Sequence, residues 1–396
     1  MQTIYDFETI TDRHFSSSKW HNMDQCSDNS ICDAVPLSTA DMEFKCAPEI
    51  VEKIKEYVSN TILGYSYMND SFVTSYINWM KERHHYTVNS EYLVPTSGVV
   101  TSLFAAVKAF TNKNDAVMVM PPVYGPFFFA VERTDRTLVE CPLICEESNY
   151  KIDFEKMESL FKTKDVKALI FCSPHNPVGR VWRREELDTL AELCIKHNVF
   201  VIADEIHHDI VLSNHDHIVF ETINPKLKNR IVTCTSLSKT FNLAGMSLAI
   251  SVIPDAENKN KFIHELAKNP DHTVNGIAYA AYEVAYNKGK TWLRLALQEI
   301  ANNLNFASDY IRQVIPSVKT YCPEGTYLLW MDFSKLGLAG ERLDEFLKTK
   351  AKLYLTPGSN FGGSSYSHFA RMNVAAPRHV IEAALERLRL AIGSLK

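Results

Sequence analysis

The feature that most constrains the fold is a series of short apolar runs that alternate with segments of helical periodicity. In residues 199–203, five apolar residues in succession are followed directly by Asp204. Such a run is typical of a central strand in a parallel sheet, because both faces of that strand are covered. Similar runs occupy residues 116–120 and 166–171, and residues 185–195 carry their apolar side chains on one helical face. The alternation predicts an α/β fold built on an open sheet.

Composition places the chain among ordinary soluble proteins. Its 396 residues are 46% hydrophobic and 22% charged, which is enough for a large core and two domains. A net charge of −5 argues against nucleic acid as a partner. The longest apolar stretch, residues 116–131, is interrupted by prolines and cannot be a membrane helix. The first residues lack the pattern of a signal peptide, so we expect a cytoplasmic protein with no membrane partner.

The cysteines predict neither a disulfide framework nor a metal site. There are nine, an odd number, and they are scattered through a chain too large to need disulfides. The pairs Cys26/Cys32 and Cys141/Cys145 lack the doubled short spacing of a zinc site. We therefore expect reduced thiols and no structural metal.

An acidic and histidine-rich segment, residues 204–209, follows the apolar run. A carboxylate directly after buried residues must be paired, because an isolated one would be neutralised by its surroundings. The segment resembles a metal site in composition. However, neighbouring residues of an extended chain face opposite ways, so Asp204, His207 and Asp209 are not expected to converge on one ion.

Changes in character along the chain predict three regions. Residues 1–45 are polar and irregular, and we interpret them as an N-terminal arm, able to pack on a partner, and part of a small domain. Residues 46–289 carry the strand and helix alternation and form the large domain. A long helical segment begins near residue 290, and we expect residues 290–396 to form a smaller C-terminal domain.

The stretch with the clearest chemical meaning is residues 235–245. It follows the apolar run 230–234, so Lys239 is expected just past the carboxyl end of a strand, where open α/β sheets bind ligands. Hydroxyls at Ser236 and Ser238 beside one amine suit a phosphate-bearing aldehyde: the hydroxyls hold the phosphate and the lysine condenses with the carbonyl. Pyridoxal phosphate is the obvious candidate.

Other positions are suited to the same ligand. A turn at Gly98 precedes a predicted helix, whose first N–H groups can bind an anion without a basic side chain. Tyr124 is held among prolines and can stack on a planar heterocycle, although a core tyrosine is equally compatible with the pattern. Tyr65 lies in an aromatic loop, where packing is the more common role.

Taken together and in order, these motifs resemble the fold-type-I pyridoxal-phosphate enzymes, the aspartate-aminotransferase-like family. Within that family the chain is similar to the cystathionine β-lyase-like C–S lyases. The resemblance extends along the whole chain and implies a large domain with a mostly parallel seven-stranded sheet flanked by helices, a smaller α+β domain, and a homodimer with shared sites. The motifs that carry it are residues 40–44, 173–182, 204–207, 236–245 and 324–327.

The resemblance also implies roles for individual residues. Lys239 would hold the cofactor covalently and then remove the α-proton of the substrate, and Asp204 would pair with the pyridine nitrogen. Asn176 would bond the 3′ oxygen of the ring, Tyr124 would stack on it, and Arg371 would bind the substrate carboxylate with two parallel bonds. Tyr65 would reach the phosphate in the neighbouring subunit and, like Tyr124, take part in catalysis. The remaining cofactor contacts implied are Gly98, Val99, Val100, His207, Ser236 and Ser238.

The implied reaction is β-elimination from L-cystathionine or L-cysteine-type amino acids, giving pyruvate, ammonia and a thiol or hydrogen sulfide. Two positions depart from relatives. Aminotransferases of this fold carry an arginine where this chain has Ser247, which favours a lyase. The C–S lyases tend to have a second tyrosine where this chain has Gly125, and a glycine is expected to open space there. An aminotransferase, or a cofactor-binding regulatory protein acting through protein contacts, remains an alternative.

Overall fold

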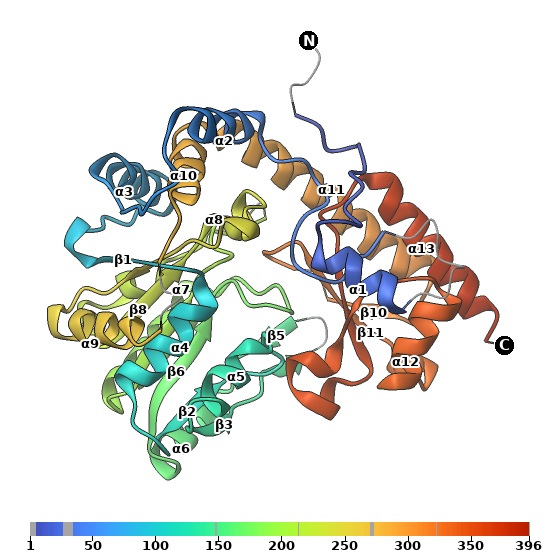
Figure 1. The fold of residues 1–396 in the computed structure, drawn as a ribbon. Coiled ribbons are helices and arrows are strands. Elements are labelled where there is room, and N and C mark those ends of the chain that lie inside the picture. The colour runs from blue at the N-terminus through green and yellow to red at the C-terminus, as the bar shows by residue number, and fades with distance from the viewer. Residues whose placement is uncertain are drawn as a thin grey trace.

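The computed structural model describes residues 5–26, 35–146, 149–212, 214–269, 273–321 and 323–395. Two units built around separate sheets lie side by side, with the C-terminal helices on the outside of the smaller one (Figure 1). Cys32 of the cysteine pairs considered above lies outside the described residues.

The large unit is organised by a seven-stranded sheet in the order β1-β9-β8-β7-β6-β2-β3. The four pairings from β8 to β3 are parallel, and β9 is antiparallel to both of its neighbours. The mostly parallel seven-stranded sheet is thereby confirmed. Its strands are β1 (Leu93–Thr96), β2 (Ala116–Val119), β3 (Thr137–Glu140), β6 (Val166–Cys172), β7 (Phe200–Asp204), β8 (Ile231–Thr235) and β9 (Ala249–Val252).

Helices cover both faces of this sheet, which explains why its central strands β6, β7 and β8 are buried at all positions but one and are mostly apolar. On one face Ile202 packs in a cluster with residues of α4 (Val99–Phe110), α5 (Pro126–Glu132) and α9 (Ala256–Ala267). On the other face Val201 packs with α6 (Phe154–Thr163) and α7 (Arg184–Lys196). Three more helices pack together beside the β1 edge: α2 (Pro48–Asn60), α3 (Asp70–His84) and α10 (Gly276–Lys288).

The smaller unit is built on an antiparallel sheet in the order β10-β11-β13-β12. The strands are β10 (Lys319–Thr320), β11 (Leu328–Asp332), β12 (Thr356–Pro357) and β13 (Phe369–Asn373). Two long helices pack on each other beside it, α11 (Lys290–Val314) and α13 (Arg378–Gly393), and α12 (Glu341–Glu345) follows β11. A hairpin of β4 (Ile144–Glu146) and β5 (Asn149–Lys151) belongs to neither sheet. We propose that the domain boundary lies at residue 290, where α11 begins.

The N-terminal region contains one helix that its polar composition did not suggest, and the other described residues before Pro48 form no helix or strand. Residues Ser18–Cys26 form α1, and Trp20 packs against Met23 and Tyr354 of the same chain. Lys19 is fully buried, with its Nζ 2.8 Å from a carboxylate oxygen of Glu43. Polar residues in this segment therefore pair internally, which a reading of composition alone could not anticipate. In the parts of the chain that the structure describes, no helix combines the length and apolar character needed to cross a bilayer.

A buried ion pair connects the two units. Arg180 follows β6, and its Nε donates to Glu324, ahead of β11, at 2.8 Å. The backbone N–H of Val181 donates to the same carboxylate oxygen at 2.9 Å. Burial alone would raise the pKa of Glu324, but the hydrogen bond and charge of Arg180 lower it. The pair therefore stabilises the fold while Glu324 is ionised.

We predict that Arg180→Met lowers the free energy of unfolding at pH 7 by about 3–5 kcal/mol, because it leaves a buried carboxylate without its partner. The difference from the wild type shrinks as the pH falls below 4.5, the ordinary pKa of a glutamate, since protonation removes the charge that needs pairing. Urea denaturation at several pH values measures both effects.

Arg184→Met is the matched control, because the side chains of Arg184 and its partner Asp188 are 53% and 47% exposed. An exposed pair contributes about 1 kcal/mol or less. Equal losses in the two variants would contradict the stabilising role of the Arg180–Glu324 pair.

Candidate active site

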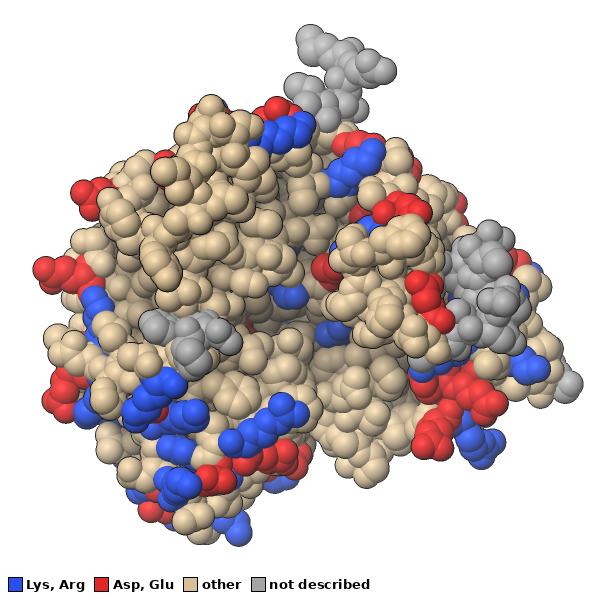
Figure 2. Space-filling model, viewed as in Figure 1, with Lys and Arg blue, Asp and Glu red and all other residues tan. Residues whose placement is uncertain are grey.

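A cavity of about 430 Å³ lies where the two sheets approach each other. Figure 2 shows the surface hollowed between the two units, with basic side chains in its depth. The ends of β6 and β7 contribute Cys172 and Asp204, and the small sheet contributes Thr356 and Arg371. Ten of the predicted site residues lie in its wall: Gly98, Val99, Val100, Tyr124, Asn176, Asp204, His207, Ser238, Lys239 and Arg371.

Lys239 is presented by α8 (Leu237–Thr240), a single turn that begins directly after β8. Its Nζ donates a hydrogen bond to the carbonyl oxygen of Ala40 at 2.6 Å. Burial lowers the pKa of Lys239 to about 8, and the charge of Arg371 adds to the effect. The amine is therefore neutral in part of the molecules near pH 7, as a nucleophile or general base requires.

Asp204 is the last residue of β7 and is 3% exposed. One carboxylate oxygen accepts the backbone N–H of Ile206 at 3.1 Å. Burial raises the pKa of Asp204 to about 7. A cationic N–H partner in the cavity would stabilise the ionised form of this carboxyl group. The protonated nitrogen of a pyridine ring is such a partner.

The start of α4 has the uncapped geometry that an anion site would use, and binding of a phosphate there stays a prediction. Gly98 has a φ of 135°, and no described side chain caps the helix, so its first N–H groups are left for a ligand in the cavity. Ser238 adds a hydroxyl to the wall. Two further hydroxyls, Ser97 and Thr101, also lie there and are 3.2 Å apart. Sequence reasoning missed this pair, although Thr101 follows Ser97, in the turn before the helix, by four residues, the spacing of one helical turn.

Ser236 occupies a different place from Ser238. Its Oγ accepts the backbone N–H of Ser238 at 3.1 Å and donates to the carbonyl of Leu248 at 2.6 Å. Ser236 is thus the N-cap of α8 and does not belong to the residues that line the cavity. Direct contact between Ser236 and a phosphate stays a prediction, whereas its support of Ser238 is visible in the geometry.

Arg371 and Asn176 are linked across the cavity. Arg371 donates to the Asn176 Oδ1 at 2.9 Å and to the carbonyl oxygen of Ser38 at 3.0 Å. Its Nε is buried and finds no hydrogen-bond partner among the described residues. Burial lowers the pKa of Arg371 to about 10, which still leaves it charged at pH 7. An unused donor on a buried guanidinium fits a substrate carboxylate.

Two ring-bearing residues complete the wall. Tyr124 lies there with its pKa raised by burial and by the charge of Asp204, so its hydroxyl is protonated. His207 is 2% exposed, and its Nδ1 has no partner within the described parts of the chain. Burial lowers the pKa of His207 well below its usual value, so the ring is neutral. Both side chains therefore face a ligand without adding charge to the cavity.

Tyr65 does not lie in this cavity. Its side chain is fully exposed in the single chain. Two nearby side chains, Ile62 and Tyr67, are 90% and 79% exposed. The role implied for Tyr65 requires a second subunit and stays a prediction.

The structure shows where the two positions that depart from relatives, Ser247 and Gly125, lie. Ser247 is exposed and does not line the cavity. The expectation that Gly125 opens space is wrong: a Cβ at this position would stand 2.7 Å from the carbonyl oxygen of Asn360. That oxygen belongs to a 3₁₀ turn, Gly358–Phe361, which also accepts the backbone N–H of Val123 at 2.9 Å. The small unit occupies the space that a side chain would take.

We predict that Gly125→Ala lowers the free energy of unfolding by about 1–3 kcal/mol, because backbone at Asn360 must move to admit the methyl group. Gly393→Ala is the control, since nothing lies within 4 Å of its Cβ position. Guanidinium denaturation of the two variants measures the difference. If both unfold at the same denaturant concentration as the wild type, the close approach of the two units at Gly125 does not constrain the side chain.

The sequence and the fold are similar to those of known enzymes, including structures that contain pyridoxal phosphate. The model of the family "Aminotransferase class I and II" matches residues 33–388. Cystathionine beta-lyase PatB of Bacillus subtilis (strain 168) is 38% identical over 91% of this chain and 93% of its own length. Cystalysin from Treponema denticola, whose structure contains a pyridoxal 5′-phosphate cofactor, has a TM-score of 0.96 at 37% identity and covers 99% of this chain and 100% of its own. The PLP-bound C–S lyase from Staphylococcus hominis has a TM-score of 0.91 at 30% identity, covering 98% of each chain. With matches that span most of its length, the chain belongs to the aminotransferase class I and II family.

Proposed function

We propose that this protein is a pyridoxal-phosphate-dependent C–S lyase that performs β-elimination on L-cysteine-type amino acids, with L-cystathionine as a substrate. The observation that carries the proposal is one cavity between the two units that holds a lysine amine of lowered pKa, a carboxyl group of raised pKa and an uncapped helix start. Its relatives among cystathionine beta-lyases and C–S lyases support the reaction class. One water is consumed for each substrate, and the products are a thiol, pyruvate and ammonia.

The residues present fit the cofactor at each of its functional groups. When bound, pyridoxal phosphate supplies an electrophilic aldehyde and a ring that accepts the electron pair left on the α-carbon. The helix start at Gly98 and the Ser238 hydroxyl would hold the phosphate. Asp204 would keep the ring nitrogen protonated, while Asn176 and Tyr124 would fix the orientation of the ring.

Substrate handling falls to two basic residues. Arg371 would bind the α-carboxylate, because its guanidinium is planar, remains charged and has an unused Nε donor. Lys239 would take the proton from the α-carbon. Since the cavity holds its pKa near 8, the amine can accept this proton at neutral pH and release it again in the same turnover.

We predict that the purified protein, supplied with pyridoxal phosphate and L-cystathionine but no keto acid, releases pyruvate and free thiol in equal amounts over many turnovers. The same assay with L-cysteine follows sulfide. Lys239→Ala should lose turnover, because it removes both the covalent attachment and the base. Pyruvate is followed with a coupled dehydrogenase and thiol with a chromogenic reagent.

Failure of this assay has a definite meaning. No pyruvate, together with conversion of the cofactor to its amine form, indicates an aminotransferase. Absence of both reactions in a protein that binds the cofactor indicates a regulatory role. Full turnover in Lys239→Ala would contradict the assignment of the site itself.

We also propose that the enzyme is a homodimer with shared sites, located in the cytoplasm, where its thiols stay reduced. Three large side chains near the end of α2, Ile62, Leu63 and Tyr65, are at least two-thirds exposed, which is unusual for a monomer and suits an interface between copies. On this arrangement Tyr65 of each subunit reaches the phosphate in the other.

Mixing two defective variants tests the shared site. We predict that Lys239→Ala and Tyr65→Ala, each with little activity alone, regain activity when unfolded and refolded together, because each hybrid dimer contains one site with both native residues. The control mixture is Lys239→Ala with Asp204→Ala, whose defects lie in the same chain's cavity and leave no native site in the hybrid. Equal activity in the two mixtures would contradict the assignment of Tyr65 to the neighbouring site.

A further inference from the structure

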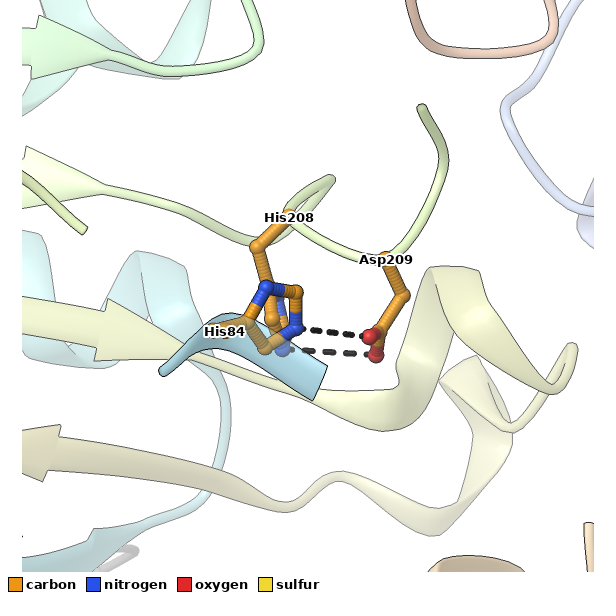
Figure 3. A group of neighbouring side chains, drawn as sticks. All are labelled: His84, His208 and Asp209. Carbon is orange, nitrogen blue, oxygen red and sulfur yellow. Dashed lines mark hydrogen bonds and ion pairs between the residues drawn. The ribbon is translucent and has the colours of Figure 1, made fainter. Parts of the chain in front are cut away.

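Behind the cavity lies a buried group of His84, His208 and Asp209, whose ligand atoms are all within 4.8 Å of one another (Figure 3). The group has the composition of a metal site. However, Asp209 Oδ1 already accepts the Nε–H of Arg83 at 2.7 Å and lies 2.8 Å from the Nε2 of His84. A guanidinium in direct contact opposes a second cation at the same oxygen. The geometry is that of a hydrogen-bonded centre organised by Asp209.

The other oxygen of Asp209 connects this centre to the active site. Oδ2 accepts a hydrogen bond from the hydroxyl of Thr240 at 2.8 Å. Thr240 is the residue after Lys239, and both belong to α8, which spans only Leu237–Thr240. A helix of one turn is not stable by itself, so its orientation depends on its contacts with the rest of the chain, and those at its two ends fix the direction of its axis. The N-terminal contact is the Ser236 cap, and the C-terminal contact is the bond from Thr240 to Asp209.

Backbone hydrogen bonds connect Asp209 to Asp204, the acidic residue of the cavity. After Asp204 the chain makes a turn in which the N–H of His208 donates to the Glu205 carbonyl at 3.0 Å and the N–H of Ile210 donates to the His207 carbonyl at 2.8 Å. Arg83 also donates to the carbonyl oxygen of Asp209 at 3.0 Å. Asp209 is thus fixed with respect to Asp204, and its side chain fixes α8.

The electrostatics keep this centre in one state. Burial would raise the pKa of Asp209, but His208, His84 and Arg83 stabilise the carboxylate and hold that pKa well below its usual value. Burial lowers the pKa of His84 to about 3. Near neutral pH the carboxylate therefore stays ionised and His84 stays neutral, as a fixed acceptor for Thr240 requires.

We propose that Thr240 and Asp209 are positioning residues that hold the Lys239 amine at a fixed place relative to Asp204. The inference rests on the role proposed above for Lys239. Without the bond from Thr240, α8 retains its Ser236 cap, the Lys239–Ala40 bond and the Ser238–Tyr282 contact but loses the contact at its C-terminal end. The amine of Lys239 then moves and becomes better hydrated.

The test uses three variants of the full-length protein loaded with pyridoxal phosphate. Thr240→Val keeps the shape of the side chain and removes the hydroxyl, whereas Thr240→Ser keeps the hydroxyl. Thr233→Val is the matched control: Thr233 is also fully buried, on β8, and its Oγ1 is without a partner in the described part of the chain. If Thr240→Val does not fold, Thr240→Ala takes its place.

Four quantities are measured: kcat and KM, the pH midpoint of the absorbance change of the bound cofactor, the dissociation constant of pyridoxal phosphate from the reconstituted protein, and the melting temperature. For Thr240→Val we expect kcat to fall roughly 10- to 100-fold with little change in KM, because a small displacement of the base affects the chemical step most. The absorbance midpoint should move to higher pH and the dissociation constant should rise. Thr240→Ser and Thr233→Val should resemble the wild type in all four.

A lower melting temperature in Thr240→Val, with kcat, absorbance midpoint and dissociation constant equal to those of Thr233→Val, would overturn the proposal, because a merely structural bond has that effect. Failure of the proposed function is distinguishable, since it shows as a lack of elimination by the wild type. The absorbance midpoint and dissociation constant of the variants still test the position of Lys239 in that case.

Discussion

The site depends on the burial of two ionisable groups, Lys239 and Asp204, at one end of the large sheet. In water their pKa values would lie near 10.5 and 3.8, and both groups would be permanently charged at neutral pH. Burial moves the pKa of Lys239 to about 8 and that of Asp204 to about 7. Near neutral pH both groups can therefore change protonation state. A charged ligand in the cavity can then determine which protonation state each group adopts. The parallel strands make this possible, since their buried ends deliver polar residues directly from the core.

The second half of the site comes from the small unit and the N-terminal segment, which meet at residues 38–41. Arg371 donates to the Ser38 carbonyl, and Asn373 of the same strand donates to the carbonyls of Thr39 and Asp41 at 2.8 and 2.7 Å. Lys239 donates to Ala40 in the same segment. One stretch of backbone thus contacts the side chains proposed for both substrate binding and proton transfer. A shift of the small unit would change the surroundings of the lysine amine as well as the carboxylate site.

The fold and most of the cavity wall could be predicted because their signals are local. An apolar run that ends in an acid identifies a buried strand end at Asp204, and a turn before a helical pattern identifies the helix start at Gly98. What could not be predicted depends on contacts between distant segments. The space beside Gly125 is filled by Asn360, and the buried Lys19 is paired with Glu43. The local sequence around Gly125 or Lys19 does not indicate Asn360 or Glu43 as the partner, because these contacts form only when distant segments pack together.

The same limit applies to the choice of reaction. Removal of the α-proton is common to elimination and amino transfer, and the two diverge according to which atom next receives a proton and whether the β-substituent leaves. At Gly125 the chain offers no side chain, and the backbone of Asn360 fills the position. Exchangeable protons near a substrate must therefore come from other residues of the cavity wall, among which Lys239 is the base proposed above. Its amine donates to the carbonyl of Ala40 and is carried by the one-turn helix α8. On the role proposed above for Lys239, the pKa and the position of this amine determine which atom it can protonate next, and so which of the two reactions follows.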